Sequence, residues 1–173
     1  SHIDAMAASK LTGALPAISG ASLTGFTDAQ MPAGSVLQVV RMQTTTATSS
    51  TSASFIDITD LDIQITPSST SSKVLVIACV KSLNPQSSSL SSVSLKLIDS
   101  NGSGVLDWDE NHGFGMGDDG ALMSESVLTG LSSPSSTSEL TYKVQGRNRQ
   151  VVAWAISQNA STKCSMVAME IAG

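Results

Sequence analysis

The acidic segment 99–110 has the spacing of a loop that wraps oxygen ligands around calcium. Oxygen-bearing side chains stand at its first, third and fifth positions, glycine at its sixth and glutamate at its twelfth. The template expects a helix on each side, but alternating sequence precedes this segment and glycine-rich sequence follows it. We therefore favour a β-hairpin turn and keep calcium as the alternative, with these candidate ligands: Asp99, Asn101, Ser103, Asp107 and Glu110.

Three aromatic or histidine side chains lie close together in the sequence. His112 and Phe114 belong to the glycine-rich stretch 109–120, and Trp108 directly precedes it. On an exposed loop, aromatic side chains could stack on a sugar or a receptor. Large apolar side chains are also often buried, so Trp108 and Phe114 could instead fill the core at a hairpin end. Both interpretations stay open from the sequence.

No catalytic signature stands out. Two carboxylates a few ångströms apart could hydrolyse a glycosidic bond, but nothing in the sequence fixes such a geometry, and a solvated acidic loop is the simpler interpretation. The candidate carboxylates are Asp107, Asp109, Glu110, Asp118 and Asp119. A Ser-His-Asp triad through His112 lacks a G-x-S-x-G turn. We expect no enzyme and no cofactor.

Two cysteines, Cys79 and Cys164, sit in apolar stretches of strand character. Two buried free thiols are the favoured interpretation, with a disulfide as the alternative. A structural zinc site would need histidines at matching spacing, and the chain has only His2 and His112.

The composition predicts an all-β protein. Of its 173 residues, 40% are hydrophobic and only 3% aromatic, so the apolar content lies in aliphatic side chains, and serine and threonine are abundant. The net charge of -5 and the lack of a basic patch argue against nucleic-acid binding. The longest apolar run, residues 74–80, is too short to span a bilayer.

Short alternating segments recur along the chain and predict strands. They cover residues 35–43, 55–58, 61–65, 74–80, 93–97, 105–108, 126–131, 140–144, 151–156 and 166–171, with polar loops at 44–54 and 67–72. The apolar parity changes between Ile58 and Leu61, which requires a bulge or turn near Thr59 and Asp60. Residues 74–80 are apolar on both parities, which predicts a central strand covered on both faces or at a subunit contact. The pattern predicts a jelly-roll-like antiparallel β-sandwich.

The segment before residue 33 differs from the rest. Leu11-Thr12-Gly13 recurs as Leu23-Thr24-Gly25, and the segment has too few apolar residues for a core of its own. It must be disordered or bury its apolar side chains against other chains, and its repetition favours the second. The expected contact residues are Leu11, Leu15, Ile18 and Leu23.

Several phrases together resemble bacteriophage tail-fibre proteins. Residues 9–25, SKLTGALPAISGASLTG, resemble fibre shaft repeats. PAGSVLQVVRMQTTT, FIDITDLDIQITPSSTSSKVLVIACV, LTYKVQGRN and MVAMEIAG, in that order, resemble a head domain of phage fibres. Residues 104–125 depart from that pattern, which leaves the role of this region open.

Residues 1–6, SHIDAM, have the character of an expression-vector remnant and are left out of the fold prediction. The resemblance implies two further parts: an intertwined trimeric shaft at 7–32 and a β-sandwich head at 33–173. It also implies a homotrimer in the virion, on a tail, neck or capsid appendage, with a role in host attachment. Its partners would be other virion proteins and a host-surface glycan or outer-membrane receptor. Two alternatives remain: a purely structural trimerisation or decoration knob, and a polysaccharide depolymerase.

Overall fold

The computed structural model describes residues 30–85, 91–99, 104–116, 120–121, 124–148, 153–156 and 162–173. Within these residues the regular structure is almost entirely β, as the composition predicts. The strands are β1 (Val36–Thr44), β2 (Thr48–Ser50), β3 (Ile56–Ile65), β4 (Lys73–Pro85), β5 (Ser91–Asp99), β6 (Val105–Met116), β7 (Gly120–Ala121), β8 (Ser124–Ser132), β9 (Leu140–Asn148), β10 (Trp154–Ile156) and β11 (Cys164–Ile171).

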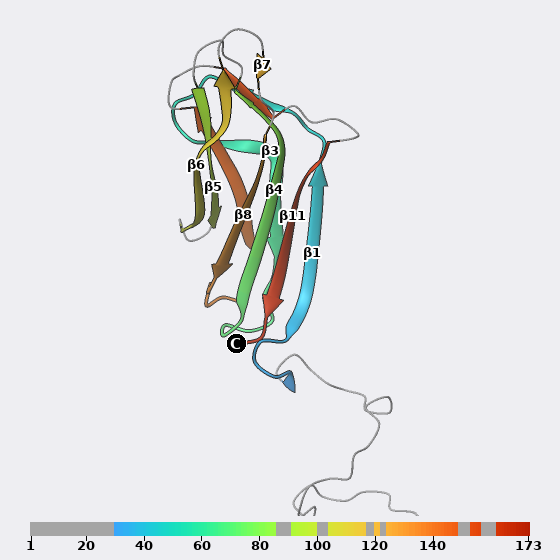
Figure 1. Ribbon diagram of the computed structural model, residues 1–173. Helices are drawn as coiled ribbons and strands as arrows, with labels where there is room; N and C mark the ends of the chain where they lie inside the picture. The colour runs from blue at the N-terminus through green and yellow to red at the C-terminus, as the bar shows by residue number, and fades with distance from the viewer. Residues whose placement is uncertain are drawn as a thin grey trace, which may run out of the picture.

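The strands form two antiparallel sheets packed face to face (Figure 1). We call them sheet A, in the order β1-β11-β4 with β8 and β10 also paired to β4, and sheet B, in the order β3-β9-β5-β6-β7. Without the short strands β2, β7 and β10, sheet A holds the first, eighth, third and sixth of the long strands. Sheet B holds the second, seventh, fourth and fifth. This order is that of a jelly roll, so the expected fold class is confirmed.

The expected change of parity lies inside one strand rather than between two. In β3 the register with β9 shifts between Asp57 and Asp62, and Asp60 at the shift has a positive φ of 54°. Residues 58–61 lie opposite the single residue Val144, and this bulge lets Ile58 and Leu61, on opposite parities, both enter the core.

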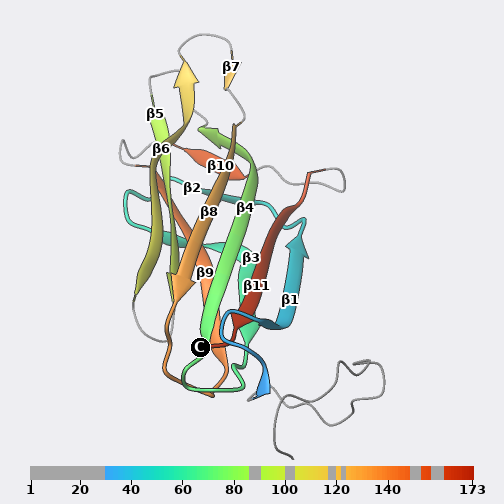
Figure 2. The ribbon, with the colours of Figure 1, turned by 60° about the horizontal axis from the view of Figure 1, so that its bottom comes forward.

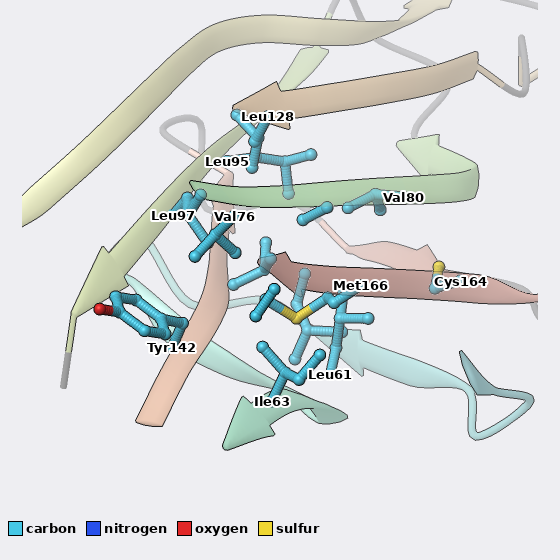
Figure 3. Close-up of a cluster of buried hydrophobic side chains, with 14 of the residues drawn as sticks. Leu61, Ile63, Val76, Val80, Leu95, Leu97, Leu128, Tyr142, Cys164 and Met166 are labelled. Atoms are coloured by element: carbon cyan, nitrogen blue, oxygen red, sulfur yellow. The ribbon is translucent and has the colours of Figure 1, made fainter. Parts of the chain in front are cut away.

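The core fills the space between the two sheets (Figure 3). Every second residue of β9, of β11 and of β4 as far as Val80 is buried, which is the period of a strand with one face inward. Trp154 of β10 is fully buried, as its alternation with apolar neighbours predicts. A Cβ built on Gly146 of β9 would lie 2.7 Å from Cη2 of Trp154, so the indole ring requires a glycine at that position.

Two loop predictions are wrong. The polar segment 44–54 contains β2, whose Thr48–Ser50 pair with β10. Most of the glycine-rich segment 109–120 belongs to β6, which continues to Met116. The pairing of β6 with β5 has three register shifts, and these bulges remove the simple alternation that would have marked a strand.

Candidate interaction surfaces

The described chain enters and leaves the sandwich at one end. Gln30, where the description begins, and the C-terminus lie together at the lower end in Figure 1, while β7 and the end of β6 form the opposite tip (Figures 1 and 2). Two backbone hydrogen bonds hold the entering segment: Gly34 N–H to the Ala172 oxygen, 2.7 Å, and Ala172 N–H to the Ser35 oxygen, 2.8 Å. We call this end the base and the other end the tip.

The proposed receptor residues lie on strand β6 rather than on a loop. Trp108 pairs with Lys96, three residues before the end of β5, whereas Phe114 pairs with Ser92, close to its start. Because of the bulges, these six steps along β6 lie opposite only four along β5, so at about 3.3 Å per residue the two backbone positions are about 13 Å apart. Of the three candidates, Phe114 is nearest the tip and Trp108 nearest the hairpin turn, with His112 between them. The structure therefore does not gather the three backbones at one point, and their binding role stays a prediction.

The calcium-like segment has strands on both sides, as a hairpin requires. Asp99 N–H donates to the Gly104 oxygen at 2.9 Å and closes the turn between β5 and β6. Asp107 Oδ2 accepts the Thr129 backbone N–H at 2.7 Å, which joins β6 to the edge of β8. Among the residues that the structure describes, no three acidic, histidine or cysteine side chains gather to hold a metal. Three candidate positions fall beyond this test: Asn101 and Ser103 are outside the described residues, as is the side chain of Glu110.

An acidic hollow lies at the β3 bulge, away from the calcium-like segment. It measures about 290 Å³ and is lined by Asp57, Asp60, Asp62 and Lys143 among others. Asp57 accepts from Lys143 Nζ at 2.7 Å and from Gln145 Nε2 at 2.5 Å. Burial alone would raise the pKa of Asp57, but these donors outweigh it and hold the pKa below its ordinary value. A carboxylate held ionised in this way is poorly suited to donate a proton at neutral pH.

The outer face of sheet B is polar and charged. Lys96, Lys143, Gln145 and Arg147 alternate with buried neighbours on β5 and β9. The ring of Phe55 lies between two of these cations, with Lys96 Nζ and Arg147 Cζ each 4.4 Å from its centroid. Sequence reasoning missed this contact, because Phe55 lies far along the chain from both cations.

The outer face of sheet A is apolar. The register aligns Val39, Met169, Leu75 and Leu131 in one row across β1, β11, β4 and β8, and places Val167 beside Ile77 in the next. Val39 is 58% exposed and Leu131 56%, and they stand at the two ends of the first row. We call these six residues the apolar face: Val39, Leu75, Ile77, Leu131, Val167 and Met169. Within the described chain, sheet B therefore covers the inner face of residues 74–80, and no other sheet covers their outer face.

A buried carboxylate fastens the base. Glu170 of β11 is fully buried, and its Oε1 accepts from Ser68 N–H, Ser68 Oγ and Ser72 Oγ, each at 2.7 Å. Its Oε2 accepts from Gln38 Nε2, also at 2.7 Å. Burial alone would raise the pKa of Glu170, but hydrogen bonds from Ser72, Gln38 and Ser68 outweigh it and hold the pKa below its ordinary value. The same serines line a hollow of about 310 Å³ beside Met31, where the chain enters.

The two cysteines lie on opposite faces of sheet A, and neither is in a disulfide. Cys164 is buried, and burial raises the pKa of its thiol. Cys79 is half-buried on the outer face, across from the 59% exposed Val127. The favoured interpretation of free thiols is confirmed, but the expectation that both are buried is wrong for Cys79.

The expected shaft contacts, Leu11, Leu15, Ile18 and Leu23, lie outside the described residues, as do Asp118 and Asp119. Within the described part of the chain, no helix has the length and apolar character to cross a lipid bilayer. In comparisons with known proteins, no family matches this chain and no curated protein is significantly similar to it.

Proposed function

We propose that this chain is the C-terminal head of a homotrimeric virion fibre protein that takes part in host attachment. One observation carries the proposal: a jelly roll whose described chain enters beside its C-terminus at the base, with the β5–β6–β7 tip at the far end (Figure 2). A shaft made by the preceding residues would therefore approach the base and leave the tip facing outward.

Three further features support this function. The fold-level analogy is that jelly rolls occur in viral capsid and lectin domains. The leucine- and glycine-containing repeat before residue 30 has too few apolar residues for a core of its own, and partner chains in a fibre would bury them. The hydrogen bonds of Gly34 and Ser35 with Ala172 fix the entering segment to the sandwich, which would transmit force from tip to shaft.

Binding by the tip is testable with the intact chain. We expect the purified protein to bind one class of ligand on an array of bacterial surface glycans, or to bind intact bacterial cells. A His112→Ala/Phe114→Ala variant should lose at least about tenfold in affinity, since a few aromatic anchors usually dominate an interface. Phe55→Leu, on the outer face of sheet B, is the control and should bind normally. Equal binding by both variants would locate the receptor surface elsewhere.

A purely structural head is the second candidate, and the apolar face favours it, because an exposed patch of this kind serves assembly better than glycan recognition. It predicts no binding to glycans or cells by the native trimer. Loss of the trimer on disrupting the head, together with such negative binding, would establish this role in place of attachment.

A further inference from the structure

We propose that the apolar face of sheet A is the surface through which each head packs against further copies of the same chain. The inference rests on the proposed homotrimer and goes beyond it by naming the surface and its occupant. In Figure 1 the four strands β1, β11, β4 and β8 lie side by side at the front of the sandwich, with sheet B behind them.

The two outer faces of the sandwich differ in chemistry, although both are built from strands with one buried side. On sheet B the outward positions of β9 are Thr141, Lys143, Gln145 and Arg147. On sheet A the outward positions of the central strand β4 include Leu75 and Ile77, and those of β11 include Val167 and Met169. A face that remains in water would favour the first composition, so the second indicates a face that a partner covers.

Charged groups surround the apolar face rather than interrupt its centre. Arg41 lies on the edge strand β1, Lys73 begins β4 at the base, and Lys81 pairs with Glu125 at 3.5 Å toward the other end. An apolar centre with a polar rim is the usual anatomy of a contact between protein chains.

The size of the face helps to identify the occupant. Four strands about 4.8 Å apart, over two rows of about 6.8 Å each along the strands, give an area on the order of 260 Å². A freely diffusing partner usually needs about 800 Å² on each side for stable binding. The face is small for such a partner, but it suffices for copies already held together, because tethering raises their effective concentration to the millimolar range.

The preceding chain supplies that tether. Twenty-nine residues come before Gln30, and they include the four leucine and isoleucine positions expected to contact other copies. The described chain starts at the base, where Ala172 follows directly on Ile171, the last residue of β11. Copies joined through the preceding segment would therefore meet at the lower end of the apolar face. A second copy is the occupant that this arrangement favours.

Cys79 provides a built-in probe of the proposed contact. It lies on the outer side of β4, one row from Ile77, whereas Cys164 faces the core and reports only on unfolding. We expect Cys79 in the native full chain to react with a maleimide at least about tenfold more slowly than in a Val39→Glu/Leu131→Glu variant, since reaction requires access to the thiol. Both replaced side chains are more than half exposed in the single chain, so the fold should tolerate glutamate there.

The matched control is Gln64→Glu/Ser138→Glu, which adds the same charge at exposed positions outside the apolar face and should leave Cys79 as slow as in the native chain. Circular dichroism checks that each variant is folded. Should the glutamates unfold the chain, the neutral pair Val39→Ser/Leu131→Ser replaces them and should still accelerate labelling several-fold.

Light scattering on the same samples separates this inference from the proposed function. A trimer with slow Cys79 labelling that the variant accelerates supports both. A trimer in which native and variant chains label equally fast overturns the inference and leaves the trimer standing. A monomer with fast labelling removes both. A monomer with slow labelling would mean that the chain's own first 29 residues cover the face, and it would also overturn the inference.

Discussion

Removing the charge of Glu170 should weaken the base of the sandwich. The side chain is fully buried, and the described contacts give its carboxylate donors from Ser68, Ser72 and Gln38. In a Glu170→Gln variant the amide oxygen can replace Oε1, but the amide nitrogen then faces the Gln38 amide nitrogen. The hydrogen bond from Gln38 is lost unless the Gln38 amide group rotates. The three hydrogen bonds from Ser68 and Ser72 remain, but their acceptor is no longer charged.

The expected cost follows from the difference between charged and neutral hydrogen bonds. A bond to a charged group contributes about 1.5–3 kcal/mol and a neutral one about 0.5–1.5 kcal/mol. Because bonds that share one acceptor are not additive, we expect a loss of about 3 kcal/mol in the free energy of unfolding. For a chain of this size that corresponds to a fall of about 6–12 °C in the melting temperature.

The loss should depend on pH in a defined direction. The pKa of Glu170 in the folded protein lies below the ordinary 4.5, so the unfolded state binds the proton more readily. The stabilisation is therefore complete above the unfolded pKa and disappears as the pH falls through the folded pKa. The gap between the native chain and Glu170→Gln should be widest near about pH 7 and should shrink as the pH drops below 4.5.

Thermal unfolding by circular dichroism measures both effects. The protein concentration is held fixed, because the midpoint of a self-associating protein depends on concentration. Asp62→Asn removes an exposed carboxylate from β3 and should shift the midpoint by no more than about 2 °C. An unchanged midpoint for Glu170→Gln at neutral pH, or a gap that is as wide in acid as at neutral pH, would refute this account of the base.

Three smaller tests probe the packing. Gly146→Ala should lower the free energy of unfolding by about 1–3 kcal/mol, because its Cβ would lie 2.7 Å from the Trp154 ring. Gly104→Ala has no atom within 4 Å of its Cβ and should lower it by less than about 1 kcal/mol; urea denaturation measures both. Phe55→Leu should lose about 1 kcal/mol by the same method, since it removes the ring between two cations. Cys164 should stay unlabelled by maleimide at neutral pH until the protein unfolds, because burial both shields its thiol and raises its pKa.

Much of the fold was predictable because burial on one face leaves a period of two in the sequence. The switch of parity between Ile58 and Leu61 predicted a bulge, and the structure places the positive φ of Asp60 there. The continuous apolar run of 74–80 predicted a central strand, and β4 pairs with β11, β8 and β10. In β3 the side chains that set the pattern enter the core, whereas in β4 one parity enters the core and Leu75 and Ile77 lie on the outer face.

Other features depend on contacts between distant segments and left no local signal. The bulges of β6 erase its alternation, so its glycine-rich sequence resembled a loop. The donors to Glu170 come from residues up to 132 positions away, and a lone glutamate in an apolar strand does not reveal them. The cations that enclose Phe55 are similarly remote, since Arg147 and Lys96 lie on two different strands.

The strands of sheet A carry information about assembly as well as about the fold. A strand whose outer face contacts only solvent needs apolar side chains on one parity only. Strand β9 has this pattern, with Tyr142 and Val144 inward and Lys143 outward. β4 is apolar on both parities, yet the described chain covers only one of its faces. Folding alone accounts for half of that pattern. The remaining half is explained if the outward aliphatic residues are selected by contact with a neighbouring copy.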